Sequence, residues 1–288
     1  MKIDKHYIYA FITISLWSMS SVTFVRLNAY MTGAQALPFA FLLAFVFLAL
    51  VNWKQGKLSQ LKSYRLKDFV IMAAMGSLGV LAYNMLNMYA YRYATGMEAA
   101  ALSFTWPIWI AIFSVIILRE KMTSRKAIVM LISFFGMLLV VTRGNFSEFA
   151  NANLFGISLA LLCGFSYGLF GVLTKKVTYD KSVAMMMYFA WAAIVAFAYL
   201  FAFDDIPQFA LTASLWILLR GIGQLGIAYT LWTMALMGDT VKIATLSLIT
   251  PFLQLLMLVI FTGEVLGIIP VVGLVFIVGG AFLGSRSK

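Results

Sequence analysis

The sequence predicts an all-α integral membrane protein whose ten transmembrane helices form two inverted-topology five-helix repeats around a central cavity. Three observations predict this fold class: the chain is mostly apolar, its apolar residues gather in ten runs, and its two halves resemble each other. Of the 288 residues, 63% are apolar and 11% are charged, and the mean hydropathy is +0.97. Soluble domains are about half apolar and about a quarter charged. Lipid must therefore surround most of this chain.

The ten apolar runs have the length of about 20 residues that a helix needs to cross a bilayer. The first run follows a charged start and exceeds the apolar core of a signal peptide, which has about 7–15 residues. We therefore expect it to be retained as a span. The fifth run is the shortest, and we expect it to extend toward Ser124. The expected spans cover residues 7–25, 34–51, 69–91, 97–118, 127–141, 154–173, 183–203, 215–236, 243–262 and 268–284.

The basic residues predict the orientation of these spans. With the N-terminus inside, 17 of the 21 Lys and Arg residues fall on the inner side, and Arg26, Arg92 and Arg143 fall outside. Cytoplasmic loops carry an excess of basic residues, so we expect a multi-pass protein of the plasma (inner) membrane with both termini cytoplasmic. The net charge of +11 is scattered between the spans. This scatter favours lipid headgroups over nucleic acid as the partner.

The two halves of the chain share a pattern. An offset of 144 residues places Pro107 on Pro251 and Glu120 on Glu264. Residues 1–145 and 150–288 would then each hold five spans. Because five is odd, the second half must enter the membrane with the opposite topology. Inverted repeats of this kind let two halves exchange inward-open and outward-open shapes around a site near the midplane.

Four segments carry a resemblance to a known family. "AAALSFTWPIWIAIFSVIILREK" and its echo "IATLSLITPFLQLLMLVIFTGEVL" resemble the fourth and ninth helices of the EamA-type transporters of the drug/metabolite transporter superfamily. "ISLWSMSSV" resembles the tryptophan segment of that family's first helix, and "AYTLWTMAL" resembles the end of its eighth. The resemblance implies ten helices in two inverted repeats, with a cavity lined mainly by helices one, three, four, six, eight and nine. Members of this family move amino acids, other metabolites or drugs.

The stretch "RGIGQLG" matches the GxGxxG pattern of dinucleotide-binding loops. That pattern has its meaning after a strand in a βαβ unit, and none is expected here. Glycines within a bilayer let helices approach closely, so we expect no cofactor. Arg220 is costly in a membrane and should face water or a partner. It either draws an anionic group into the cavity or turns outward to Asp204 and Asp205.

Polar and aromatic residues on the spans are candidates for the substrate site. Amides and hydroxyls on a membrane helix need hydrogen-bond partners, either in a wet cavity or on another helix. Aromatic rings stack on flat substrates or cage a cation, or else pack in the core. The expected substrate-binding residues are Trp17, Ser21, Tyr83, Asn84, Asn87, Trp106, Tyr167, Arg220, Gln224, Tyr229 and Trp232.

Two prolines and two glutamates are candidates for hinge or gating residues. Pro107 and Pro251 each remove a backbone hydrogen bond near mid-helix, which favours a kink that is either a hinge or a static bend. Glu120 and Glu264 end their helices, where the dipole does not favour a carboxylate. We therefore expect each glutamate to have a basic side chain or a following helix N-terminus as its partner, in a structural or gating role.

The composition excludes several function classes. The single cysteine, Cys163, and the single histidine, His6, give no disulfide or metal-ligand spacing, and the spans offer no catalytic constellation. We expect a transporter, not an enzyme, that moves a small metabolite outward, most simply an amino acid or related zwitterion. Alternatives are a carrier of aromatic organic cations or drugs and a channel-like or structural protein. A GxxxG in the last span suits packing within the molecule or in a homodimer.

Overall fold

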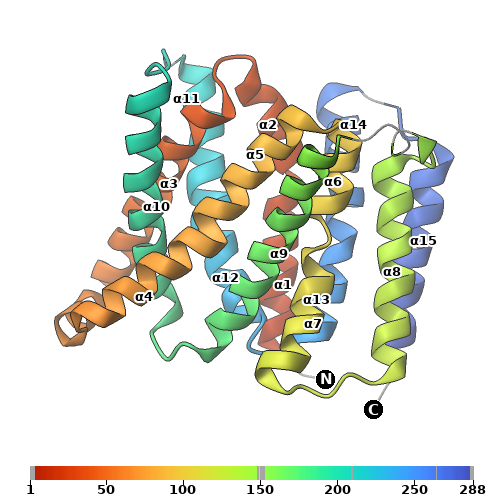
Figure 1. The fold of residues 1–288 in the computed structure, drawn as a ribbon, viewed down its shortest axis with the longest axis horizontal. Helices are drawn as coiled ribbons and strands as arrows, with labels where there is room; N and C mark the ends of the chain where they lie inside the picture. Colours follow the sequence, from red (N-terminus) through yellow and green to blue (C-terminus); the bar gives the residue numbers. More distant parts are fainter. Residues whose placement is uncertain (1–3, 148, 150–152, 209, 264, 286–288) are drawn as a thin grey trace.

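The computed structural model describes residues 4–147, 149, 153–208, 210–263 and 265–285, and it is a bundle of helices (Figure 1). Within these residues the chain forms no β-strand. In the described part of the chain, nine helical segments are long and apolar enough to cross a membrane, and α15 (Ile268–Ser285) is a further apolar helix. The expected all-helical, multi-spanning class is therefore confirmed.

The helices follow the apolar runs in order. Most of the nine long segments contain a short break or a change of helix type, so one span carries two or three labels. The short helix η1 (Lys57–Ser63) lies between the second and third spans. The other elements are α1 (Lys5–Ser18) and α2 (Ser20–Asn28); α3 (Gly33–Lys54); α4 (Leu66–Gly76), η2 (Ser77–Ala82) and α5 (Tyr83–Tyr93); α6 (Gly96–Ser103) and α7 (Trp106–Leu118); α8 (Ser124–Thr142); α9 (Leu154–Lys176); α10 (Lys181–Phe203); α11 (Leu211–Leu218), η4 (Leu219–Ile227) and α12 (Ala228–Ala235); and α13 (Thr240–Leu246), η5 (Ser247–Ile249) and α14 (Thr250–Thr262).

Polar capping residues extend several helices past the apolar runs that predicted them. The fifth span begins at Ser124, as expected, because the Thr123 hydroxyl accepts a hydrogen bond from the Lys126 N–H at 3.3 Å. α3 begins with a capping box in which the Thr32 hydroxyl accepts from the Gln35 N–H at 3.2 Å. Such caps satisfy N–H groups that have no partner within the helix. Hydropathy alone does not detect these capping residues, so it places the helix ends too far inside.

The regular α-helix is interrupted just before each of the two prolines at which the sequence led us to expect a kink. The helix of the fourth span is interrupted at Phe104 and Thr105, and the ninth span passes through the 3-10 segment η5, so that Pro107 and Pro251 lie in the first turns of α7 and α14. A proline is tolerated there because an N–H at that position has no intrahelical partner to lose. Thr105 and Ser247 donate hydrogen bonds of 2.6 Å to the carbonyls of Leu102 and Ala244. The same two carbonyls also accept the backbone N–H groups of Thr105 and Ser247, so each hydroxyl bond reinforces the tight turn just before the proline.

The helices pack closely where glycine removes a side chain. α8 and α15 lie side by side at one edge of the bundle (Figure 1), with Gly136 against Gly273; a Cβ on Gly136 would lie 2.5 Å from the Gly273 carbonyl oxygen. Gly280 faces Ser133 and Val129 of α8. This glycine of the predicted GxxxG therefore makes a contact within the chain.

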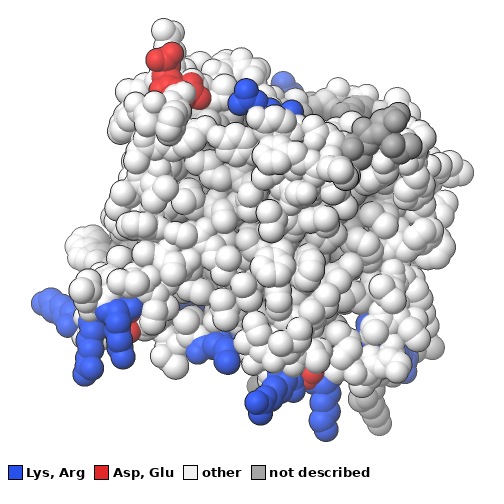
Figure 2. All heavy atoms as spheres, in the orientation of Figure 1, with Lys and Arg blue, Asp and Glu red and all other residues white. Residues whose placement is uncertain are grey.

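The charges divide between the two ends of the bundle. α1 begins and α15 ends at the same end, and on the face shown most Lys and Arg side chains gather there (Figures 1 and 2). We call it the basic end. Ion pairs join the loops there: Lys57 with Asp180 at 2.9 Å, and Lys126 with Asp239 at 3.0 Å. The loop after α10, with Asp204 and Asp205, lies at the opposite end.

Candidate functional site

A cavity of about 370 Å³ lies between the helices. It reaches toward the end opposite the basic end, where Phe24 and Val25 of α2 and Tyr91 of α5 are 43%, 48% and 38% exposed. The second span also contributes to its wall, beyond the six helices that the family resemblance implied. The lining residues include Trp17, Ser20, Ser21, Phe24, Gly33, Ala36, Leu37, Tyr83, Asn84, Asn87, Met88, Tyr91, Phe104, Trp106, Tyr167, Arg220, Gln224, Leu225, Tyr229, Thr250, Gln254 and Leu258.

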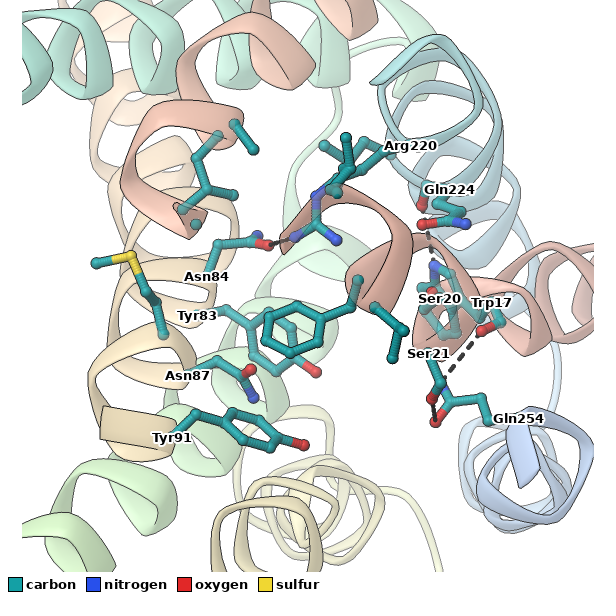
Figure 3. A pocket seen from close by; sticks show the side chains of 18 of the residues that line it. Trp17, Ser20, Ser21, Tyr83, Asn84, Asn87, Tyr91, Arg220, Gln224 and Gln254 are labelled. Atoms are coloured by element: carbon teal, nitrogen blue, oxygen red, sulfur yellow. Dashed lines mark hydrogen bonds between the residues drawn. The ribbon is translucent and has the colours of Figure 1, made fainter. Parts of the chain in front are cut away.

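The cavity brings together all but one of the residues that the sequence proposed for the substrate site. They come from five separate spans, and Figure 3 shows several of them converging on the same space. The predicted residues that line the cavity are Trp17, Ser21, Tyr83, Asn84, Asn87, Trp106, Tyr167, Arg220, Gln224 and Tyr229.

Aromatic rings form the wall of the cavity toward the basic end. Trp17 meets the rings of Trp106, Tyr167 and Tyr229 at centroid distances of 6.0, 6.2 and 5.9 Å, each edge to face. The Trp17 indole donates a hydrogen bond of 3.0 Å to the carbonyl of Gln224, which holds the ring in place. This wall is a rigid apolar surface on which a flat group can stack.

Trp232, which the sequence also proposed for the substrate site, is not among the residues that line the cavity. It is fully buried behind the wall, with centroid distances of 5.4 Å to Trp17 and 5.3 Å to Trp106. The physical reason is its position on α12, where it fills the space beneath the two other tryptophans. Trp232 supports the residues that face the cavity and does not face it.

Arg220 turns into the cavity. Its Nη2 lies 3.5 Å from Oδ1 of Asn84, and its Nε is buried without a hydrogen-bond partner (Figure 3). The outward alternative is wrong because the carboxylate of Asp204 accepts hydrogen bonds from Thr32 and Gln35 instead, each at 3.2 Å. None of the described lining residues is an Asp or Glu. The guanidinium is therefore a positive charge without a carboxylate partner among them.

The two amides of the third span are held by hydrogen bonds, one within the span and one to α9. Asn84 donates through Nδ2 to the Val80 carbonyl at 2.8 Å, which directs its Oδ1 toward Arg220. Asn87 donates to Sγ of Cys163 at 3.7 Å, and that thiol lies 3.4 Å from the Tyr83 carbonyl that it donates to. The buried cysteine thus serves as a hydrogen-bonding partner between α9 and the third span.

The polar residues that the third and eighth spans contribute to the cavity lie directly after or within a π-helical segment. η2 ends one residue before Tyr83, and η4 contains Arg220 and Gln224. π-helical turns within α-helices often occur at functional sites. At the start of each region a glycine packs on the backbone of a neighbouring helix: a Cβ on Gly76 would lie 2.8 Å from the Tyr188 carbonyl oxygen, and one on Gly221 would lie 2.8 Å from that of Ala40. These close contacts position the third span against α10 and the eighth span against α3.

The sequence reading missed Gln254 of α14. Its Nε2 donates to the Trp17 carbonyl at 3.1 Å, and its Oε1 accepts from the Ser21 hydroxyl at 3.4 Å (Figure 3). A single amide in the apolar run "TPFLQLLMLVIFT" was the available signal. Phe24, Leu258 and other apolar lining residues carried no signal, because they look like ordinary span residues.

A polar network closes the bundle at the basic end. Glu120, which follows α7, accepts hydrogen bonds of 2.7 Å from Nζ of Lys175 and from the hydroxyl of Thr240, the first residue of α13. Lys175 also donates to the Gly238 carbonyl at 3.0 Å. Glu120 therefore has the basic side chain that the sequence led us to expect as one of the two possible partners. Its counterpart Glu264 lies outside the described residues.

Comparison with known proteins places the chain in a family. The sequence model of the EamA-like transporter family matches residues 4–142 and again residues 154–286. An uncharacterized transporter of Archaeoglobus fulgidus is 23% identical over 292 residues, which covers 99% of each protein. The aromatic amino acid exporter YddG of Ancylobacter novellus is 26% identical over 188 residues, covering 63% of this chain and 64% of that protein.

A solved crystal structure has the same fold, with a TM-score of 0.84 at 19% identity, covering 97% of this chain and 96% of that one. Since the family match spans almost the whole sequence, the chain belongs to the EamA-like transporter family.

Proposed function

We propose that this protein is a secondary transporter that exports an amino acid with an aromatic side chain, or a related zwitterion, by alternating access. The observation that carries the proposal is the guanidinium of Arg220, which faces a cavity walled by aromatic rings and has no carboxylate partner among the described lining residues. A substrate carboxylate would supply the missing charge in a paired, charge-assisted hydrogen bond. The ring of the substrate would stack on the wall that contains Trp17 and Trp106.

The relatives support the substrate class. One of them is named as an aromatic amino acid exporter. An aromatic organic cation or drug is the second candidate, because the same rings suit cation–π contacts. Arg220 disfavours it, since a second positive charge in the cavity would be repelled.

The proposed topology is ten spans in two inverted repeats, residues 1–145 and 150–288, with both termini on the cytoplasmic side of the plasma membrane. Its support is the separate family match to each half and the common end of the bundle at which α1 begins and α15 ends. The gathering of Lys and Arg at that end favours the cytoplasm for it (Figure 2).

In the proposed cycle the structure represents the outward-open shape. The cavity reaches the end opposite the basic end, while Glu120, Lys175 and Thr240 hold the basic end closed. The inward-open shape would separate these three residues and close the opposite mouth. The breaks beside Pro107 and Pro251 would let the halves of their spans tilt. Without a carboxylate among the described lining residues, the substrate gradient itself is the simplest driving force.

Counterflow in liposomes tests the proposal. Purified protein is reconstituted with unlabelled L-phenylalanine inside, and entry of labelled L-phenylalanine is measured. We expect saturable exchange by the wild type and a loss of at least about tenfold in Arg220→Gln, since a charge-assisted bond is removed. Ser214→Ala, outside the cavity wall, is the control. No saturable exchange of any amino acid by folded wild-type protein would refute the proposal, and selective exchange of aromatic cations would favour the second candidate.

A further inference from the structure

The orientation of one amide next to Arg220 is determined by its neighbours. Nε2 of Gln224 donates to the hydroxyl of Thr23 at 2.8 Å. That hydroxyl donates its own hydrogen bond to the Met19 carbonyl at 3.0 Å, so it acts as the acceptor toward Gln224. With the amide reversed, two acceptors would face each other. Oε1 of Gln224 must therefore point away from Thr23.

This Oε1 is an acceptor without a donor. Gln224 is 3% exposed and lines the cavity, and its Oε1 makes no hydrogen bond within the described residues. Two donors from residues around Gln224 bond other acceptors: the indole of Trp17 bonds the Gln224 carbonyl, and Nε2 of Gln254 bonds the Trp17 carbonyl. A buried acceptor left without a partner is costly. A ligand that brings a donor would remove that cost.

A second buried atom without a hydrogen-bond partner belongs to Arg220, and it is a donor where the Gln224 oxygen is an acceptor. Arg220 lies four residues before Gln224 on η4, about one helical turn away, and its buried Nε is a donor without an acceptor. Two residues that line the cavity from the same segment thus carry an unmet donor with a positive charge and an unmet acceptor. An α-amino acid carries the complementary pair, a carboxylate and an ammonium group, on a single carbon atom.

We propose that Gln224 determines specificity by accepting a hydrogen bond from the amino group of the substrate, so that the carrier selects amino acids over carboxylates that lack this group. The inference rests on the proposed function and adds the second half of the recognition. Arg220 binds the carboxylate, and Gln224 accepts a hydrogen bond from the ammonium group. Thr23 holds the Gln224 amide in its accepting orientation. A hydrogen bond from a charged donor accounts for a preference of about tenfold to a hundredfold.

Competition in proteoliposomes tests this assignment. Counterflow of labelled L-phenylalanine is inhibited with unlabelled L-phenylalanine or with 3-phenylpropionate, which has the same ring and carboxylate but no amino group. In the wild type we expect L-phenylalanine to inhibit at a concentration at least about tenfold lower. Gln224→Met keeps the length of the side chain and removes the acceptor. It should weaken inhibition by L-phenylalanine to near the level of the analogue and leave inhibition by the analogue within about twofold.

Two further variants sharpen the result. Gln254→Met makes the same chemical change at an amide whose ends are both bonded, and it should leave the ratio between the two inhibitors unchanged. Thr23→Val frees the Gln224 amide to turn and should lower the ratio partway, which provides a test if Gln224→Met does not fold. Equal inhibition by both compounds in the wild type, or an unchanged ratio in folded Gln224→Met, overturns the assignment of Gln224. Absence of any amino acid exchange in the wild type instead refutes the proposed function.

Discussion

Asn84 and Arg220 meet in the cavity from the third and eighth spans, with Oδ1 of the amide 3.5 Å from Nη2 of the guanidinium. The Val80 carbonyl binds the other end of the same amide at 2.8 Å. Asn84 therefore orients Arg220 without neutralising it, and the positive charge stays available to an anionic group. The pair also ties the two halves of the chain together at the candidate site.

Replacing Asn84 should disturb substrate binding through Arg220. We expect Asn84→Leu to raise KM for L-phenylalanine by about threefold to tenfold, since one hydrogen bond to a charged group is lost. Counterflow kinetics measure the change. In an Arg220→Gln background the same substitution should have little further effect, because the two residues act as one unit. Independent, additive effects would contradict this coupling.

The network at the basic end should stabilise the closed shape. We expect Glu120→Ala to lower the free energy of unfolding by about 1–3 kcal/mol, because it leaves Lys175 and the Thr240 hydroxyl without their shared acceptor. Thermal unfolding in detergent measures the loss. Lys57→Met, which breaks a two-membered pair with Asp180, serves as the comparison and should cost about 1 kcal/mol or less. An equal loss in both variants would argue against a special role for Glu120.

Two glycines on η4 should respond differently to alanine. A Cβ on Gly221 would lie 2.8 Å from the Ala40 carbonyl oxygen, whereas one on Gly223 would first meet a side-chain atom at 3.4 Å. We expect Gly221→Ala to destabilise the protein by about 1–3 kcal/mol through overpacking against backbone. Gly223→Ala should be neutral or slightly stabilising, since alanine favours a helix. The melting temperatures of the two variants, compared with that of the wild type, measure the difference. Gly76→Ala should lose stability as Gly221→Ala does.

Substitutions at Trp232 and Trp106 should distinguish a residue that packs in the core from one that contacts the substrate. Trp232 is buried behind the aromatic wall, while Trp106 lines the cavity. We expect Trp232→Phe to lower the free energy of unfolding by about 1–3 kcal/mol through loss of buried volume, with KM changed by less than about twofold. Trp106→Phe should raise KM because a stacking surface shrinks. A large rise in KM for Trp232→Phe would show that its ring reaches the substrate after all.

Asp180 should contribute to stability in a pH-dependent way. Burial raises the pKa of its carboxyl, but hydrogen bonds from Lys57 and from the N–H groups of Val183 and Ser182 outweigh this effect and hold the pKa below its ordinary value. Because the pKa is lower in the folded state, the contribution is complete above the unfolded pKa of about 3.9 and is lost as pH falls through the folded value. We expect thermal stability to decline below about pH 4 and Asp180→Asn to decline less. Parallel curves for the two proteins would rule this out.

The positions of the spans could be read from the sequence because a bilayer imposes a simple requirement. A helix must present about 20 apolar residues to lipid, and each apolar run predicted in this way became a helix. The polar candidates were also found by this logic, since amides and a guanidinium within an apolar run need partners that lipid cannot supply. Ten of the eleven proposed site residues line one cavity for this reason.

The failures share a different physical origin. Trp232 looked like Trp106, and nothing in the local pattern distinguishes a ring that faces a cavity from one that supports it. Pro107 and Pro251 predicted an interruption of the helix, but its form depended on the turns just before them, where the hydroxyls of Thr105 and Ser247 bond the carbonyls of Leu102 and Ala244. Gln254 was a visible polar residue whose partners, Trp17 and Ser21, lie more than two hundred positions away in the chain.

The amino-acid sequence alone determined the membrane class, the order of the helices, the end at which basic residues gather and the polar side chains that need a partner. These properties depend on local composition and on the free energy of moving each segment from water into lipid. The tertiary structure decided which way Arg220 points, which acceptor of Gln224 is left open and which rings form the wall. Those outcomes depend on contacts between helices far apart in the chain, where packing and hydrogen-bond geometry select one arrangement among several that the sequence permits.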